Sequence, residues 1–412
     1  MDEIEIPPYF LCPISFQIMK DPVTTVTGIT YDRQSIEKWL LTAKICVCPV
    51  TNQALPRSKE FLTPNHTLQR LIKAWISSNE AKDVDDQVPS PKYSLDRIHL
   101  QKLVKNLEVP SCFRTTMEKI HDLAKQSERN RTCMVEVGVT KAMVMVIRKS
   151  FKQGNTICLE EGLKTISLLW HEAMVKNMIK PLVGGNMEFI NSLAWILKIY
   201  IDNNDVKMVN EVMTLMKLTI DIVDSSLIGN LNIEFFRQIV RVLQKRGLFS
   251  KQTIKSALHV LISTSSLGKN RTRIVEAGGV SELIEIELEN PKKSVTELIF
   301  NLLAHLCLSA EGREQFLRHA AGIAMLTKRI LRVSAATDDL AIQVISVIAK
   351  YASSKDILEM LRVGAVSKLC MVMQADCASY LKEKARDILR LHSTSWNNSP
   401  CIQVYFLTRN QR

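Results

Sequence analysis

The sequence predicts a small α+β unit at the N-terminus, followed by an all-α solenoid of helical repeats. Three observations support this fold class. Residues 5–78 combine a β-rich stretch with two amphipathic helical segments, the pattern from residue 94 to the end is helical, and a related segment recurs every 43 residues near the C-terminus. The low content of glycine (14 of 412 residues) and of aromatic residues (6%) favours helices over β-architecture.

The N-terminal unit contains two incomplete zinc-ligand pairs. Structural zinc requires four thiolate or imidazole ligands, usually supplied as closely spaced Cys pairs. The chain has Cys12-Pro13-Ile14-Ser15 and Cys48-Pro49-Val50-Thr51, so Ser15 and Thr51 stand where the second thiolates would be. Because a hydroxyl does not replace a thiolate on zinc, we predict that the unit binds no metal and that Cys12 and Cys48 are small buried side chains.

Polar side chains surround these two half-pairs. They can form hydrogen bonds and ion pairs that hold the same loops, provided that each member of the network is satisfied. The residues concerned are Ser15, Asp21, Asp32, Arg33, Glu37 and Thr51.

Capping and turn residues predict the elements of this unit. The stretch 23–31 is rich in β-forming residues, and Gly28 marks a turn within it. Asp32 is a suitable N-cap for a following helix. Thr63 and Pro64 predict a second helix, with Thr63 as N-cap and Pro64 at the first helical position.

Residues 79–93 are polar and contain two prolines, which predicts a linker. Beyond it, Val280, Ile323 and Val366 occupy equivalent places in a segment that repeats every 43 residues. A period in the low-to-mid forties is typical of armadillo and HEAT repeats. We expect repeats over 94–378, a curved solenoid with a long groove, and a helical cap over 379–412. At each repeat corner, small residues predict that a short helix passes into a long one.

The formal net charge of +12 is unevenly distributed. Residues 1–80 carry eight basic and eight acidic side chains, so the surplus lies in the remainder. A basic surface attracts acidic proteins, nucleic acid or anionic lipid, but lysine-rich outer faces of a helical array are the simpler explanation. No stretch has the Arg/Lys block or stacking aromatics of a nucleic-acid module, so we expect no nucleic-acid partner.

The tryptophans of the repeat region argue against one armadillo function. Importin-like proteins line their groove with tryptophan and place an asparagine one helical turn later. Here Trp170, Trp195 and Trp396 are followed at that distance by Met174, Ile199 and Pro400. We therefore disfavour a nuclear-import receptor and expect these rings to pack in the core or in ridges.

The sequence also bears on the compartment. No apolar run approaches the length of a membrane-spanning helix, and the acidic start does not resemble a signal peptide. Ten scattered cysteines are typical of a reducing cytosol or nucleus. We expect a cytoplasmic protein, with a nuclear pool left open, and no integral membrane association.

The segment from Ile6 to Trp75, including "FLCPISFQIMKDPV", "CPVT" and "LTPNHTLQRLIKAW", resembles a U-box, the metal-free relative of the RING. The resemblance covers residues 5–78. An N-terminal U-box followed by helical repeats resembles the plant U-box/armadillo ligases. The resemblance implies an E3 ubiquitin ligase that docks a ubiquitin-charged E2 and needs no cofactor. It also implies a protein substrate on the armadillo repeats and a role in plant defence or stress signalling.

The same resemblance implies which residues dock the E2. In this family two loops and the first helix form a shallow apolar groove. The matching positions are Ile14 and Phe16 in the first loop, Trp39 on the helix, and Pro49 in the second loop, with Asn52 just beyond it. The positions that match the structural pattern of the U-box are Cys12, Asp21, Pro22, Tyr31, Asp32, Pro64 and Asn65.

Such a ligase has no covalent ubiquitin intermediate, because the catalytic cysteine belongs to the E2, so the chain needs no catalytic residue of its own. Two departures bear on its strength. Some ligases have Arg or Lys where Asn52 stands, and the second loop is one or two residues longer than usual. A non-catalytic armadillo adaptor with a weakened U-box, and a solenoid that binds lipid or nucleic acid, are the alternatives. The sequence leaves self-association into a homo-oligomer open.

Overall fold

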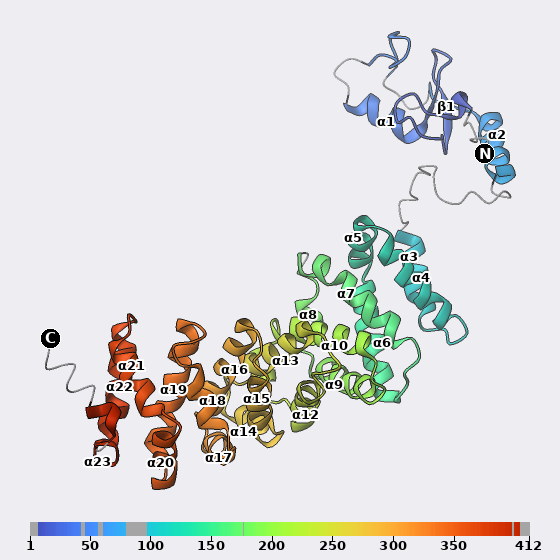
Figure 1. The fold of residues 1–412 in the computed structure, drawn as a ribbon. Coiled ribbons are helices and arrows are strands. Elements are labelled where there is room, and N and C mark those ends of the chain that lie inside the picture. The colour runs from blue at the N-terminus through green and yellow to red at the C-terminus, as the bar shows by residue number, and fades with distance from the viewer. Residues whose placement is uncertain are drawn as a thin grey trace. The chain divides into compact units, whose positions relative to one another are not determined.

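The computed structural model describes residues 7–42, 46–56, 61–79, 97–175, 177–397 and 399–403. The chain forms two compact units, Met1–Asp96 and Arg97–Arg412 (Figure 1). The first is α+β and the second all-α, so the predicted fold class is confirmed. The predicted linker 79–93, apart from Asn79 at the end of a helix, lies outside the described residues. Residues 43–45 of the second loop also lie outside them.

The N-terminal unit is built on a small three-stranded sheet. Its described elements are the 3-10 turn η1 (Pro8–Phe10), β1 (Pro22–Thr24), β2 (Thr30–Asp32), α1 (Arg33–Thr42), β3 (Thr63–Pro64) and α2 (His66–Asn79). The strand order is β2-β1-β3, and both outer strands are antiparallel to β1. Gly28, with φ of +78°, makes the predicted turn between β1 and β2.

The second helix does not begin where the sequence predicts. Thr63 and Pro64 form β3, which pairs with Val23 and Thr24 of β1, so Thr63 is not an N-cap. Asn65 caps α2 instead, since its Oδ1 accepts a 3.0 Å hydrogen bond from the Leu68 amide. The prediction failed because pairing with a distant strand outweighed a local Thr-Pro capping signal.

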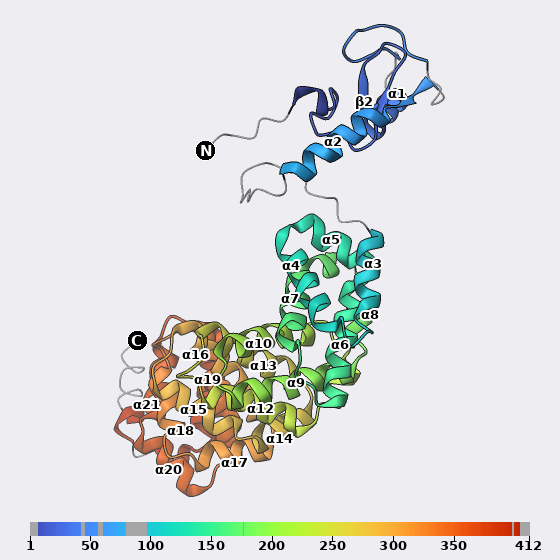
Figure 2. The ribbon, with the colours of Figure 1, turned by 90° about the vertical axis from the view of Figure 1, so that its right-hand side faces the viewer.

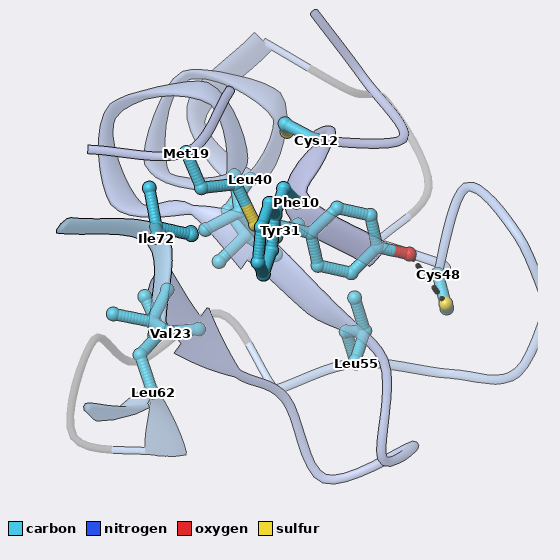
Figure 3. Packing of buried hydrophobic residues seen from close by; sticks show 11 residues of the cluster. Phe10, Cys12, Met19, Val23, Tyr31, Leu40, Cys48, Leu55, Leu62 and Ile72 are labelled. Carbon is cyan, nitrogen blue, oxygen red and sulfur yellow. Dashed lines mark hydrogen bonds between the residues drawn. The ribbon is translucent and has the colours of Figure 1, made fainter. Parts of the chain in front are cut away.

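The core of this unit gathers around Tyr31. Its ring is fully buried on β2 and points towards Cys48 (Figure 3). Cys12 and Cys48 are also fully buried. The whole cluster comprises Phe10, Cys12, Met19, Val23, Tyr31, Ile36, Leu40, Cys48, Leu55, Leu62 and Ile72.

The C-terminal unit consists of helices throughout its described residues. Figure 2 shows these helices following one another along a curved body. Their bounds are α3 (Arg97–Asn106), α4 (Phe113–Gln126), α5 (Glu128–Val137), α6 (Val139–Gln153), α7 (Leu159–Val175), α8 (Lys180–Val183), α9 (Met187–Asp202), α10 (Val206–Ile220), α11 (Ser225–Ile228), α12 (Ile233–Gln244), α13 (Lys251–Thr264), α14 (Gly268–Glu276), α15 (Gly279–Leu288), α16 (Lys293–Leu306), α17 (Ala310–Arg318), α18 (Gly322–Arg329), α19 (Ala335–Tyr351), α20 (Ser354–Arg362), α21 (Ala365–Gln374), α22 (Ser379–Leu391) and α23 (Ser393–Trp396).

Each repeat contributes three helices, and corresponding helices of successive repeats pack in rows. The second helices α3, α6, α9, α12, α15, α18 and α21 each contact the next, and so do the third helices α4, α7, α10, α13, α16, α19 and α22. Neighbouring repeats therefore bury one another's apolar faces, as in a solenoid. Since α22 packs on α19 as α19 packs on α16, the last repeat includes α22, and the predicted boundary at residue 378 falls inside it.

Small residues form the repeat corners, as the sequence predicts. Gly278 and Gly364 have φ of +87° and +82°, a conformation that glycine adopts without strain. At Gly322 an added Cβ would lie 2.7 Å from the Phe316 carbonyl oxygen, so a larger residue does not fit. The expected passage from a short to a long helix is wrong. The corner joins two helices of similar length, such as α14 (9 residues) and α15 (10), and the longer helix is the third.

The tryptophans of the repeats pack as expected. Trp170 and Trp396 are buried, and the Trp396 Nε1 donates to the Ile357 carbonyl at 3.3 Å. Trp195 packs edge-on against Phe151, with ring centroids 5.8 Å apart.

Candidate functional site

The first loop of the N-terminal unit, residues 11–18, is a tight hairpin-like turn. The Cys12 amide donates to the Gln17 carbonyl at 2.8 Å, and the Phe16 amide donates to the Cys12 carbonyl at 2.8 Å. Leu11 and Ile18 form an isolated antiparallel bridge that closes the turn. Phe16 itself has φ of +54°, a left-handed conformation that is uncommon for an aromatic residue.

The second loop, residues 47–54, repeats this geometry 36 residues later. The Cys48 amide donates to the Gln53 carbonyl at 2.8 Å, and the Asn52 amide donates to the Cys48 carbonyl at 2.9 Å. Val47 and Ala54 form the closing bridge, and Asn52 has φ of +56°. The sequences Cys-Pro-Ile-Ser-Phe-Gln and Cys-Pro-Val-Thr-Asn-Gln therefore encode one loop conformation twice.

Hydrogen bonds to the Cys48 sulfur fix the second loop. Its Sγ accepts from the Tyr31 hydroxyl at 3.0 Å, from the Thr27 hydroxyl at 3.4 Å and from the Thr51 amide at 3.4 Å. Burial raises the pKa of the thiol, but the hydrogen bonds from Thr27, Thr51 and Tyr31 outweigh burial and lower the pKa to about 6. The sulfur joins the second loop to β2 and to the turn before it.

The Cys12 sulfur fixes the first loop in a similar way. It accepts a 3.3 Å hydrogen bond from the Asp32 amide. Burial raises the pKa of the thiol, while hydrogen bonds from the Asp32, Ser15 and Ile14 backbone and from the Ser15 side chain lower it, and the net shift is downward. The sulfur connects the first loop to the end of β2.

Asp21, Asp32 and Arg33 form part of the predicted polar network. The Asp32 Oδ1 accepts from the Lys20 and Asp21 amides at 2.9 and 3.1 Å. Asp21 in turn pairs with Arg33, whose Nε lies 2.5 Å from Oδ2. These contacts fix the segment between the first loop and β1 against the start of α1.

The residues predicted to dock an E2 occupy the rim of these loops. Phe16 is 78% exposed, whereas Ile14 and Trp39 are half-buried and pack against the core cluster. The Trp39 Nε1 donates to the Val47 carbonyl at 3.0 Å, so α1 is tied to the second loop. Asn52 is exposed. The two loops and α1 thus carry an exposed aromatic ring, two half-buried apolar side chains and a polar amide.

Comparison with known proteins places this geometry in a family. A family model described as U-box domain matches residues 6–81, and one described as Plant U-box protein ARM repeat region matches residues 99–412. The chain belongs to the plant U-box proteins with armadillo repeats. The family resemblance inferred from the sequence is thereby confirmed.

Two similar proteins come from Arabidopsis thaliana. E3 ubiquitin-protein ligase PUB24 is 36% identical, over 99% of this chain and 96% of the relative. E3 ubiquitin-protein ligase PUB23 is 34% identical, over 97% and 96%. A chain of the solved structure "A conserved phosphorylation switch controls the interaction between cadherin and beta-catenin in vitro and in vivo" overlays with a TM-score of 0.56 at 12% identity. That match covers 79% of this chain and 58% of the other, and it supports the armadillo fold alone.

The U-box contains a rim residue that the sequence analysis missed. Val50 stands where Ile14 stands in the first loop, and it is 51% exposed. The signal was present, because the two six-residue loop sequences align at a spacing of 36. Together, Ile14, Phe16, Pro49 and Val50 supply apolar groups from both loops.

The U-box loops are suited to binding rather than to covalent chemistry. Although the pKa of Cys48 is low, the side chains of Cys48 and Cys12 are fully buried and their sulfurs accept hydrogen bonds. Neither sulfur is accessible to a thioester on another protein. Among the described residues, no group of three or more His, Cys, Asp and Glu side chains has the arrangement of a metal site. No helix in this part of the chain has both the length and the apolarity to cross a membrane.

Proposed function

We propose that this protein is an E3 ubiquitin ligase whose U-box docks a ubiquitin-charged E2. The observation that carries the proposal is the apolar rim of Ile14, Phe16, Pro49 and Val50 on two hydrogen-bonded loops. Exposed apolar side chains on a rigid surface are typical of protein-binding sites, where a few residues supply most of the affinity. The relatives named as E3 ubiquitin-protein ligases, at 36% and 34% identity over nearly the whole chain, support the activity.

The mechanism is positioning. The E2 carries ubiquitin as a thioester, and the ligase holds that thioester in a reactive pose close to a substrate lysine. Ile14 and Phe16 contact the E2 from the first loop, and Pro49 and Val50 contact it from the second. The Trp39 ring keeps the second loop against α1 through its hydrogen bond to Val47.

Asn52 sets the strength of this positioning. It is exposed at the end of the second loop, and we infer that its side-chain donor contacts both E2 and ubiquitin. A neutral amide forms weaker hydrogen bonds to carbonyl groups than a cation does. Asn52 therefore limits the rate rather than preventing the reaction, because it holds the closed thioester less firmly than a cationic residue would.

The armadillo repeats hold the protein substrate, which places its lysines within reach of the E2. The assignments to the cytoplasm, with a nuclear pool, and to plant defence or stress signalling belong to this proposal and rest on the reducing-compartment cysteine pattern and on family resemblance. Self-association is compatible with all of these roles.

The experiment is a reconstituted reaction with E1, a panel of E2s, ubiquitin and the full-length protein. We expect ubiquitin chains from the wild-type protein and a loss of at least about tenfold in Ile14→Ala, because a central anchor contributes about 2 kcal/mol or more. Leu71→Ala is the matched control, since Leu71 is an exposed apolar residue of α2 in the same unit. Circular dichroism confirms that both variants are folded.

If Ile14→Ala forms ubiquitin chains as fast as the wild-type protein does, the E2 docks elsewhere. A wild-type protein without activity with any E2, yet folded, would favour the non-catalytic adaptor.

A further inference from the structure

The helix α13, which is the third helix of its armadillo repeat, carries a row of basic side chains on one side. Along α13, Lys251, Lys255 and His259 are spaced by four residues, so they lie on one side of the helix. Lys251 is exposed, and Lys255 and His259 are half-buried. The other side of α13 is buried among its neighbours, and the sequence of the helix contains no carboxylate.

The neighbouring helix α10 adds charged groups to this row. Lys217 of α10 and Asp221, the residue that follows α10, both act on His259 electrostatically. Burial lowers the pKa of His259, Lys217 and Lys255 lower it further, and Asp221 raises it, with a net downward shift. The imidazole is therefore neutral near pH 7 and supplies one N–H donor. We call Lys217, Lys251, Lys255 and His259 the α13 stripe.

Several arginines and lysines elsewhere in the armadillo repeats pair with carboxylates of a neighbouring repeat. Within the described residues, the lysines of the α13 stripe have no ion pair within 4.0 Å. Each helix that packs beside α13 carries one carboxylate with a partner of its own. Glu211 of α10 accepts from Ser167, and Glu297 of α16 accepts from Ser334 and pairs with Lys293. These pairs between repeats include Arg148–Glu188, Arg241–Asp202, Arg246–Glu282, Arg329–Glu287 and Lys384–Asp339.

The stripe has the size and chemistry of a peptide-binding site. Lys251 and His259 are eight positions apart on the helix, a distance of about 12 Å, which is the length of about four residues of extended chain. Three cations and one neutral donor complement a short run of carboxylates. A single-stranded nucleic acid needs stacking rings, and α13 has none beyond the imidazole. A membrane surface needs a denser basic cluster than three lysines beside Asp221.

We propose that the α13 stripe binds an acidic segment of the protein substrate, with Asp and Glu carboxylates facing Lys217, Lys255 and Lys251. This inference rests on the proposed function for the identity of the bound protein as a substrate. It adds that substrate selection depends on a run of negative charge rather than on an apolar motif alone.

The test measures binding of a fluorescein-labelled synthetic peptide of Glu, Asp, Gly and Ser to the full-length protein by fluorescence anisotropy. The same peptide with Gln and Asn in place of its acidic residues is the uncharged probe. We expect tight binding of the acidic peptide only, weakening with added salt because exposed charges are screened. Lys217→Gln/Lys255→Gln should weaken binding about tenfold, which corresponds to about 1.4 kcal/mol.

Two matched variants guard against general charge and folding effects. Lys141→Gln/Lys269→Gln removes the same charge from exposed positions on α6 and α14, away from the stripe, and should bind as the wild type does. Lys217→Arg/Lys255→Arg keeps the charge and should retain most of the affinity.

Equal affinity for the acidic and uncharged peptides, or equal weakening in the two Gln variants, would overturn the proposal. Binding to phosphatidylserine vesicles without binding to the acidic peptide would overturn it in favour of a lipid surface. E2-thioester discharge by the wild-type protein onto free lysine is measured in parallel. Peptide binding without discharge would refute the ligase activity and leave the stripe as a binding site, whereas discharge without peptide binding would refute the stripe alone.

Discussion

Replacing Tyr31 by phenylalanine should loosen the second loop of the U-box without changing its core. The ring of Tyr31 is fully buried, and its hydroxyl lies 3.0 Å from the Cys48 sulfur. Phenylalanine keeps the ring and therefore leaves no cavity. Only one hydrogen bond is lost, and Cys48 keeps its donors from Thr27 and Thr51.

The free energy of unfolding that Tyr31→Phe removes depends on whether the Cys48 sulfur is charged. A neutral hydrogen bond contributes about 1 kcal/mol and one to a charged group about 1.5–3 kcal/mol. The folded-state pKa of Cys48 is lowered to about 6 from an ordinary value of 9.0. The ionised thiol therefore stabilises the fold fully above pH 9.0, and this contribution is lost as the pH falls through 6. Tyr31→Phe should thus cost about 2 kcal/mol near pH 8 and about 1 kcal/mol near pH 5.5.

Hydrogen exchange by mass spectrometry on the full-length protein measures this cost, because peptides from residues 46–56 report the opening of the loop. Tyr9→Phe is the control, since Tyr9 is 65% exposed. A difference of 1 kcal/mol moves the melting temperature of a domain this small by about 4–8 °C, so thermal unfolding is a second readout. A cost that equals that of Tyr9→Phe, or that is the same at both pH values, would refute the role given to the thiol.

Two further predictions concern the second loop and metal. Asn52→Arg should speed discharge of the E2–ubiquitin thioester by up to about tenfold with little change in E2 affinity, because a cation strengthens the hydrogen bonds. Because Asn52 has φ of +56°, where asparagine is favoured, replacement by either arginine or glutamine adds strain. Asn52→Gln is therefore the matched control, and equal discharge by both variants would contradict the charge argument. Chelation should leave the melting temperature and the activity of the U-box unchanged, since hydrogen bonds to Cys12 and Cys48 hold its loops; stoichiometric zinc in the purified protein, lost together with the fold, would contradict this.

Local signals predicted the parts of the fold that local physics determines. The turn at Gly28 and the repeat corners at Gly278 and Gly364 follow from backbone conformations that glycine favours. The 43-residue period predicted the stacked repeats, because each unit buries its apolar face against the next. Where a distant partner decided the outcome, prediction failed: Thr63 joins β1 as a strand rather than capping α2.

The candidate site was only partly predictable for the same reason. Missing ligands at Ser15 and Thr51 predicted a metal-free loop pair, and family resemblance supplied Ile14, Phe16 and Trp39. Two of the three donors to the Cys48 sulfur come from residues 17 and 21 positions earlier in the chain, namely Tyr31 and Thr27. No local pattern could pair them before the sheet was known.

The lifetime of the E2–ubiquitin thioester tests the central claim most directly. The thioester is incubated with free lysine, a chelator and the full-length protein, and the products are separated without reductant. The account predicts that the E2 thioester disappears faster than without the protein and that none of the ten cysteines of this chain acquires ubiquitin. An unchanged thioester lifetime, or a ubiquitin thioester on this chain, would contradict an E3 ligase that acts by positioning alone.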